Sequence, residues 1–285
     1  NPEITPHAIS NRADFEHLVN GYDGAISYLD HHIGRILDKL KQLGIEDDTA
    51  VIFTADHGEA FGEHGIYGEH AYAHPANTRV PLIVHWPGVT DKLAPEQRAH
   101  DGLFYHLDLG PTLCDMLDLS TPAGWHGKSF APILRGEALE GRDHLVLTQG
   151  VHTFQRAVRK GDMLYIRTLH PGTYKADPEM LYDLAVDPHM TNDLMATQPE
   201  RAAPLKANLA DWWYQYAGTP TSGPDKLQQN VQRGPVLYSE PERYVKRLES
   251  SGRGHLAADY RARLGAALKD QHAIPAHEKP RPKPV

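Results

Sequence analysis

The stretch DDTAVIFTADHGEAFGEHGIYGEHAYAH, residues 47–74, joins an apolar run to a dense group of polar side chains. Its first part, TAVIFTA (49–55), is a continuous β-branched and aromatic run, which predicts a strand buried on both faces of a parallel sheet. Metal-binding and proton-transferring groups follow that run directly, so the stretch predicts a fold and a candidate site together. These groups are four histidines and four carboxylates: His57, His64, His70, His74, Asp56, Glu59, Glu63 and Glu69.

The segments on either side of this stretch predict an α/β fold. Residues 14–43 repeat apolar side chains at steps of three and four, which predicts a long helix, and Gly44 is its expected stop. A second apolar run, VPLIVHW (80–86), predicts another strand. Helix, strand, loop and strand follow one another in doubly wound sheets, where ligands bind beyond the carboxyl ends of the strands. Asp56 and His57 come at that end of the first strand.

The chain after residue 100 predicts a further helix and a second, smaller sheet. Residues 106–119 have a helical pattern. Short strand-like runs separated by Gly, Pro and Asp then predict a small antiparallel sheet from about residue 143 to 185. A helix at 200–216 is expected to cover this sheet. Its inward-facing residues would be Leu205, Leu209, Trp212 and Trp213.

The C-terminal part predicts short helices and an irregular tail. A Gly/Pro-rich connection at 218–235 is followed by Ser239 and Glu242, which form the signature of a helix N-terminal capping box. The end of the chain, IPAHEKPRPKPV (274–285), is expected to be extended or disordered. One face of a second short helix would consist of Leu256, Tyr260, Leu264 and Leu268.

Composition limits the class of protein. The 285 residues, 40% of them hydrophobic and 23% charged, are ordinary for a globular protein with a sizeable core. The net charge of −8 gives no indication of nucleic acid or an anionic membrane as a partner. Cys114 is the single cysteine, so an intrachain disulfide is excluded, and no apolar run is long enough to span a membrane. The oligomeric state stays open. So does the compartment, which would be the periplasm or the exterior if the full-length protein has a signal peptide, and otherwise the cytoplasm.

Asp56, His57, Gly58 and Glu59 are the focus of the candidate site. A carboxylate and an imidazole next to each other can reach one ion only if the backbone turns sharply, and a glycine permits that turn. Asp-His-Gly is also a common sequence in turns without any function. The position directly after an apolar strand, and the Glu-Ala-Phe-Gly-Glu-His-Gly that follows, make a functional role the stronger interpretation.

The motif is embedded in longer segments that form a recognisable set. They are YDGAISYLDHHIGRILDKLKQLGIEDDTAVIFTADHGEAFGEHGIYGEH (22–70), TRVPLIVHWPG (78–88), DLGPTL (108–113), WHGKSFAPILRG (125–136), QRAVRKGDMLYIRT (155–168) and MLYDLAVDPHMTNDL (180–194). In this order they resemble the second half of the catalytic domain of a sulfatase. Sulfatases belong to the alkaline phosphatase superfamily, so the resemblance implies an α/β fold of that type. Part of the doubly wound sheet would be present, with a smaller C-terminal antiparallel-sheet subdomain.

This resemblance implies three regions. Residues 1–140 would be the C-terminal half of the catalytic α/β domain. Residues 141–217 would be the small subdomain of antiparallel sheet and helix, and residues 218–285 a helical C-terminal extension with a Pro-rich, disordered tail.

The family resemblance also implies a metal site and a nucleophile. In sulfatases the Asp and His of this motif bind a divalent cation, which assigns Asp56 and His57 as metal ligands. In sulfatases an acidic pair completes that site, and the nucleophile is a formylglycine made from the Cys of a Cys-x-Pro/Ala-x-Arg motif. Both lie in the N-terminal part of the proteins of this family. This chain has neither, since Cys114 is followed by Asp-Met-Leu-Asp. The chain is therefore expected to be a C-terminal portion whose partner is the missing N-terminal half of the catalytic domain.

A histidine is expected to protonate the departing alcohol, because imidazole can carry a proton near neutral pH. Many sulfatases have a Lys or His some 13 residues past the metal-binding pair, which points to His70. His64 and His74 are rivals, and for each the alternative is a solvated loop histidine. His152, His74 and Arg156 are candidates for substrate binding. The alternative for His152 is a surface position without contact to substrate. The alternative for Arg156 is an ion pair with a carboxylate on the sheet face.

The function implied is hydrolysis of sulfuric esters with a divalent cation and a formylglycine. Most sulfatases use Ca²⁺, whereas an imidazole ligand is more typical of Mn²⁺ or Zn²⁺. A phosphodiester or phosphonate monoester hydrolase of the same superfamily is the nearest alternative. A non-catalytic fragment that binds a cation or a sulfated ligand is the alternative of another class. The sequence leaves open which sulfate ester would be the substrate.

Overall fold

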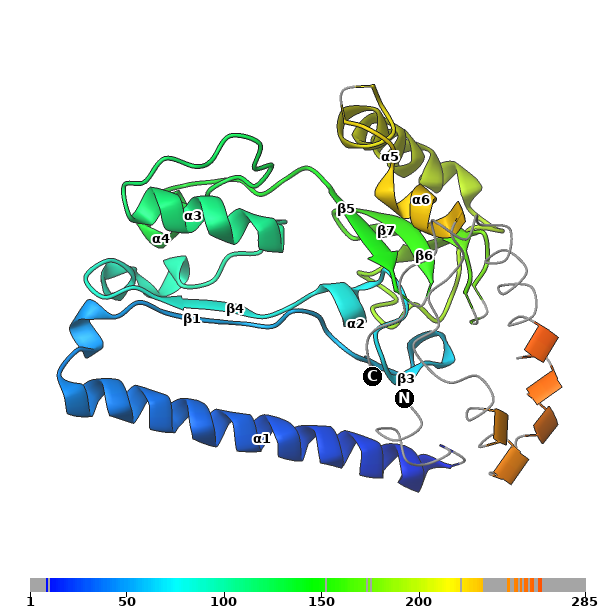
Figure 1. Ribbon diagram of the computed structural model, residues 1–285, viewed down its shortest axis with the longest axis horizontal. Coiled ribbons are helices and arrows are strands. Elements are labelled where there is room, and N and C mark those ends of the chain that lie inside the picture. Colours follow the sequence, from blue (N-terminus) through cyan, green and yellow to red (C-terminus); the bar gives the residue numbers. More distant parts are fainter. Residues whose placement is uncertain are drawn as a thin grey trace, which may run out of the picture. The chain divides into compact units, whose positions relative to one another are not determined.

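The computed structural model describes residue 9, residues 11–151, 153–172, 174, 176–220 and 222–232, and short pieces between 245 and 262. It divides into two compact units, which are described separately (Figure 1). Residues 9–56 and 80–145 form what we call the helix unit. The described residues of 57–79 and 146–262 form the sheet unit. The boundary in the candidate stretch falls between Asp56 and His57.

The helix unit begins with the long helix α1 (Arg12–Leu43), which confirms the predicted helix. Asn11 caps its first turn by accepting a hydrogen bond from the Asp14 backbone, and Gly44 ends it in the left-handed conformation at φ 66°. No residue of α1 is buried, and the apolar stripe is exposed: Ile26 is 53% accessible. A surface of this kind on a long helix is typical of one that lies against further protein.

Strands β1 (Val51–Thr54) and β4 (Leu82–His85) form a two-stranded antiparallel sheet, with Ile52 opposite Val84. The prediction of a parallel strand buried on both faces was therefore wrong for the described residues. All of β1 is only half-buried, and Ile83 of β4 is 62% exposed. A continuous apolar run indicates that both faces can be covered, but it carries no information about strand direction, which depends on the route of the chain between the strands.

The remaining helices of the helix unit are α3 (Leu109–Met116) and α4 (Ala131–Leu134). Asp108, directly before α3, is buried, and its carboxylate accepts hydrogen bonds from the backbone of Tyr105 and Lys128 and from the Arg142 guanidinium. A buried carboxylate must be satisfied in this way, and the bonds tie three separate loops to the start of α3. The helical prediction for residues 106–119 is thus confirmed for α3 and the 3₁₀ turn before it.

The sheet unit is built on a four-stranded sheet in the order β5-β6-β7-β8. Pairing is antiparallel from β6 to β7 and from β7 to β8, which confirms the predicted small antiparallel sheet. Side chains of these strands are buried on both faces. Each wholly buried Leu or Ile contributes roughly 1.5–3 kcal/mol to folding. The strands are β5 (Leu145–Gly150), β6 (Phe154–Lys160), β7 (Met163–His170) and β8 (Glu179–Asp183).

Helix α5 (Ala203–Tyr216) packs on one face of this sheet, as predicted. Leu205 is buried there, and Leu209 and Trp212 pack against the same apolar cluster. Trp213 instead donates its indole N–H to Asp225, just before the short helix α6 (Lys226–Gln232).

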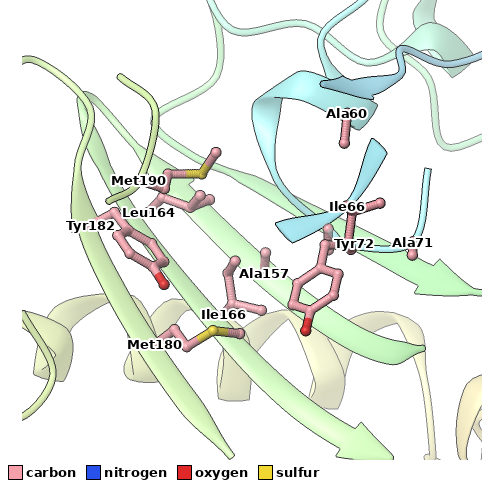
Figure 2. Packing of buried hydrophobic residues seen from close by; sticks show 11 residues of the cluster. Ala60, Ile66, Ala71, Tyr72, Ala157, Leu164, Ile166, Met180, Tyr182 and Met190 are labelled. Atoms are coloured by element: carbon pink, nitrogen blue, oxygen red, sulfur yellow. The ribbon is translucent and has the colours of Figure 1, made fainter. Parts of the chain in front are cut away.

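The opposite face of the sheet holds residues 57–79, which contain β2 (Ala60–Phe61), β3 (Tyr67–Glu69) and the single-turn helix α2 (Pro75–Thr78). Figure 2 shows Ile66 and Tyr72 of this segment beside sheet residues such as Ile166. The cluster consists of Ala60, Ile66, Ala71, Tyr72, Ala73, Ala157, Leu164, Ile166, Met180, Tyr182 and Met190. The Ala73 N–H also donates to the buried Gln155 side chain of β6 at 3.0 Å. The segment that carries most of the candidate site is therefore fixed to the sheet.

Several predictions lie outside the described residues: His152, the capping box at Ser239 and Glu242, the second C-terminal helix face and the Pro-rich tail. Within the described part of the chain, no helix combines the length and hydropathy that a membrane span requires.

Candidate functional site

Asp56 and His57 follow β1 as predicted. The strand ends at Thr54, and both residues are exposed. Gly58 comes next, and its backbone N–H donates to the Asn77 carbonyl at 2.8 Å. A Cβ at this position would meet the Ala76 carbonyl oxygen at 2.1 Å. The sequence predicted that Gly58 permits a sharp turn, but its φ is not among the positive values found for other glycines. A glycine is required here because two backbones pack closely.

His57, Glu59 and His70 converge in the sheet unit. One ligand atom from each lies within 4.8 Å of those of the other two. The His70 Nδ1 atom is 3.2 Å from Glu59 Oε1, and the His57 and His70 rings stack with centres 3.8 Å apart and planes inclined by 29°. His57 is exposed, whereas Glu59 and His70 are half-buried. Of the residues predicted to act together, the structure brings His57 and His70 into contact.

The hydrogen bonds of the His57 and His70 rings indicate which nitrogen of each ring carries a proton. The His57 Nδ1 lies 2.9 Å from the Gly58 carbonyl oxygen, so Nδ1 is the protonated nitrogen and Nε2 carries the lone pair that can bind a metal. The Glu59 carboxylate likewise accepts a hydrogen bond from His70 Nδ1 at 3.2 Å, so Nε2 is the His70 nitrogen that can exchange a proton with a substrate.

The ring separation indicates that His57 and His70 do not share one ion in this arrangement. Two imidazoles on a single tetrahedral ion, with metal–nitrogen distances of about 2.0–2.1 Å, hold their ring centres about 5 Å apart. The observed 3.8 Å is too short for that. One ring as ligand and the other as acid fits the geometry better than two ligands.

The alternative of a solvated loop histidine was wrong for His74, whereas His64 is half-buried in the 3₁₀ turn Glu63–Gly65. His74 is 0% exposed at the start of α2, and burial lowers its pKa to about 4. Burial also lowers the pKa of His64, whose ring stacks on Tyr72 at 4.8 Å. The enclosure of His74 gives no support to its predicted contact with substrate.

Arg156 is buried on β6, where its guanidinium pairs with Asp225 at 2.6 Å and lies over the Trp212 ring at 4.5 Å. The structure thus favours the alternative, pairing with a carboxylate, over substrate binding. Asp225 was not predicted, because it lies 69 residues further along in a Gly/Pro-rich connection. Glu59 was also missed as a separate contributor, although its place two residues after His57 was a usable signal.

Comparisons with known proteins match this architecture. The sequence profile of the sulfatase family matches residues 3–119, and that of the C-terminal region of N-sulphoglucosamine sulphohydrolase matches residues 62–214. The second profile alone covers more than half of the chain. The chain belongs to the sulfatase family. This membership, in the alkaline phosphatase superfamily, confirms the resemblance seen in the sequence.

Individual relatives of this sulfatase chain agree. It is 31% identical over 179 residues to choline-sulfatase of Rhizobium meliloti, which covers 60% of this chain and 32% of the relative. A Bacteroides thetaiotaomicron protein assigned to the sulfatases is similar in structure, with a TM-score of 0.63, 27% identity and coverage of 72% of this chain and 45% of that one. A phosphonate monoester hydrolase of Agrobacterium radiobacter gives a TM-score of 0.52 at 28% identity, over 67% of this chain and 39% of its own. The chain spans about a third of the length of the curated relatives it matches.

Proposed function

We propose that this chain forms part of the active site of a sulfuric ester hydrolase. The observation that carries the proposal is the arrangement of His70, which is half-buried, held by Glu59 and stacked on His57. The proposed acid and the proposed metal ligand are thereby adjacent, on a segment fixed to a sheet in a chain of the sulfatase family.

In this proposal Asp56 and His57 are ligands of a divalent cation. The donor set fits a divalent cation, because an exposed carboxylate precedes an imidazole. The hydrogen bond from His57 Nδ1 to the Gly58 carbonyl keeps the proton on Nδ1 and leaves the lone pair on Nε2 for a metal. A bound cation would neutralise charge that develops on the sulfuryl oxygens. Ca²⁺ takes six to eight ligands, so further oxygen donors must come from outside this pair. Ca²⁺ is favoured on family grounds, with Mn²⁺ or Zn²⁺ as alternatives because of the imidazole.

His70 is the proposed acid for the departing alcohol. Its Nδ1 is held by Glu59 Oε1, which fixes the ring and directs Nε2 away from the carboxylate. A positioned general acid typically contributes 10²–10⁴-fold to rate. His152 and Arg156 remain predictions as substrate contacts, and the buried pairing of Arg156 makes it the weaker of the two.

The nucleophile, a formylglycine, is expected from the N-terminal half of the catalytic domain. The exposed apolar faces of α1 and β4 support this partnership, because such surfaces in a soluble enzyme are normally covered. We propose that α1, β1 and β4 belong to a larger doubly wound sheet completed by that half. The region boundaries at residues 140 and 217 belong to the same proposal.

The test is turnover by the complete enzyme, with this chain and the formylglycine-bearing half together. Aryl sulfate hydrolysis that a chelator abolishes and a divalent cation restores is the expected result. Cation or sulfated-ligand binding without any turnover would instead favour a non-catalytic binding protein.

A phosphodiester or phosphonate monoester hydrolase is the second candidate, favoured by the structural similarity to the Agrobacterium phosphonate monoester hydrolase. The relative values of kcat/KM on an aryl sulfate and on an aryl phosphonate monoester with the same leaving group decide between them. A higher value on the sulfate supports the sulfatase.

A further inference from the structure

Residues 70–73, between β3 and α2, form a short stretch of irregular backbone inside the sheet unit. Ala71, Tyr72 and Ala73 are buried and belong to the apolar cluster on the sheet (Figure 2). Buried backbone outside helices and strands still needs hydrogen-bond partners for its N–H and carbonyl groups. The side chains that supply these partners therefore determine how the stretch lies.

Two side chains of the sheet unit hold the backbone carbonyls at the start of this stretch. The amide of Gln149, on β5, donates to the His70 carbonyl, and the hydroxyl of Thr153, directly before β6, donates to the Ala71 carbonyl. The Gln149 Oε1 atom accepts the Gly150 backbone N–H at 2.9 Å, which fixes the Gln149 side chain. Thr153 is wholly buried, so water does not compete for its hydroxyl.

Gln155 holds the end of the same stretch. This wholly buried side chain of β6 accepts the Ala73 N–H through Oε1 at 3.0 Å, and its amide donates to the Thr168 hydroxyl of β7 at 3.2 Å. The pairing register of β6 with β7 shifts between Phe154 and Gln155, and such an irregularity changes the direction in which a side chain points. Three polar side chains from β5, β6 and the residue before β6 thus converge on residues 70–73.

These bonds bear on the candidate site because His70 is the first residue of the stretch. Its Nδ1 atom lies 3.2 Å from Glu59 Oε1, and its ring stacks on His57 with centres 3.8 Å apart. Both contacts depend on where the His70 backbone is held. Apolar packing keeps the stretch on the sheet but is non-directional, whereas hydrogen bonds also fix direction. A misplacement of about 1 Å can cost an enzyme roughly 10²-fold in rate.

We propose that Gln149, Thr153 and Gln155 are positioning residues, which together form a polar clamp on the backbone of residues 70–73. The clamp holds the His70 ring against Glu59 and His57. The three residues act through His70 and not on the substrate. Their catalytic importance rests on the proposed function, in which His70 is the acid for the departing alcohol.

The first test compares Thr153→Val with Thr153→Ser in the complete enzyme. Valine keeps the shape of threonine and removes the hydroxyl, whereas serine keeps the hydroxyl. Thr153→Val should lower kcat about tenfold for aryl sulfates with poor leaving groups and less than about twofold for activated ones. Thr153→Ser should restore the wild-type pattern. Gln149→Met, at a half-buried position that tolerates substitution better, should behave like Thr153→Val.

The matched control is Thr112→Val in the helix unit. Thr112 is also buried, and its hydroxyl also donates to a backbone carbonyl, that of Asp108. Thr112→Val should lower the Tm at least as much as Thr153→Val, but it should slow no class of ester selectively. A loss of stability is thereby separated from a loss of position.

A double variant tests whether the clamp acts through His70. In the His70→Gln background, Thr153→Val should cause no further slowing that depends on the leaving group, because the positioned group is gone. Equal slowing of all esters by Thr153→Val, or an additive effect in the double variant, would overturn the proposal. Turnover by the wild type would still support the proposed function in that case.

The last measurement is independent of turnover. In the full chain, labelled with ¹⁵N at its histidines, the stacked His57 and His70 rings should shift each other's ring-proton signals, which His57→Asn and His70→Gln assign. Thr153→Val and Gln149→Met should reduce these shifts and weaken the ring-to-ring NOE, and Thr153→Ser should preserve them. Unchanged signals in the first two variants would overturn the clamp even in an active enzyme. The expected signals, together with a complete enzyme that lacks turnover, would support the clamp and refute the proposed function alone.

Discussion

At the scale of single residues, the candidate site separates into two histidines with different surroundings. His57 turns its Nδ1 to a backbone carbonyl, and His70 turns its Nδ1 to the Glu59 carboxylate. These partners orient the two rings although the residues are 13 positions apart in the sequence. Roles for each can therefore be tested by single substitutions.

Asp56→Ala is expected to lower the affinity of the complete enzyme for its divalent cation at least tenfold and to abolish its activity. The substitution removes an oxygen donor that His57 cannot replace. Calorimetric titration of the metal-free enzyme measures the affinity. Asp47→Ala, at another exposed carboxylate of the helix unit, is the control. Equal affinities in the two variants would exclude Asp56 as a ligand.

His70→Gln is expected to slow esters with poor leaving groups by 10²–10⁴-fold and activated aryl esters far less, because only a basic leaving group requires a proton in the transition state. Glu59→Gln should give a weaker effect with the same dependence. Rates across aryl sulfates of graded phenol pKa measure this, with His85→Gln on the surface of the helix unit as control. Equal slowing of all substrates would remove the acid assignment from His70.

At the scale of elements, the four-stranded sheet is joined to the chain after α5 by polar contacts as well as by its apolar core. The buried Asp225 carboxylate binds Arg156 of β6, the Trp213 indole and the Leu227 backbone. At the other end of α5, Lys206 reaches Glu179 of β8 at 2.8 Å. These contacts fix the helix to particular strands, which an apolar stripe alone would not do.

Arg156→Met is expected to destabilise the sheet unit by about 3–5 kcal/mol, because it leaves Asp225 buried without its cation. The double variant Arg156→Met/Asp225→Leu should cost less than Arg156→Met alone, since no uncompensated charge remains. Urea unfolding followed by tryptophan fluorescence measures both. Arg167→Met, in an ion pair whose arginine is 50% exposed, is the control and should cost less than about 1 kcal/mol. A loss that small at Arg156 would contradict the structural role.

Glu179 predicts an acid-sensitive contact between β8 and α5. Hydrogen bonds from Lys206 and Tyr165 lower the Glu179 pKa from its ordinary value of 4.5 to about 2. Since the folded state holds the carboxylate ionised, this contribution to stability is complete above pH 4.5 and is lost as the pH falls toward 2. In Glu179→Gln, the free energy of unfolding should fall less between pH 4.5 and 2 than in the wild type. In the control Glu140→Gln, at an exposed residue, it should fall as much as in the wild type. If the free energy of unfolding fell with pH in the same way for wild type and Glu179→Gln, the assignment would be contradicted.

At the scale of the whole molecule, the two units differ in how well their apolar surfaces are covered. The sheet unit has closed clusters on both faces of its sheet. The helix unit exposes large apolar side chains along α1 and β4, among them Tyr28 and Ile83. In the function proposed above, the N-terminal half of the catalytic domain would cover these exposed side chains.

We expect this chain alone to bind an apolar fluorescent dye at its helix unit and to lack sulfatase turnover, because the nucleophile is assigned elsewhere. Ile26→Glu/Leu29→Glu should reduce dye binding without lowering the Tm, since both side chains are exposed. Denaturing intact-mass spectrometry with peptide sequencing of the natural enzyme should find a formylglycine-bearing peptide together with this chain. A natural enzyme consisting of this 31.8 kDa chain alone would refute the sulfatase mechanism proposed here.

Sequence patterns predicted the elements whose cause is local. The helix stop at Gly44 and the strand-like runs between residues 143 and 185 follow from backbone preference and side-chain periodicity, which act over a few residues. The antiparallel pairing of β1 with β4 was missed, because an apolar run has the same appearance in either strand direction. The positions of Asp56 and His57 after β1 were predicted, since they follow from chain order alone.

The sequence by itself determined the family, the secondary structure of the main elements and the residue types available for catalysis. Only the tertiary structure decided which of those residues meet: Glu59 with His70, Arg156 with Asp225, and His64 with His74. The physical reason is that burial and pairing depend on contacts between segments distant in sequence. Four histidines that look alike in residues 57–74 thereby become a stacked pair, His57 and His70, and a second pair, the half-buried His64 and the buried His74, with unpaired ring nitrogens.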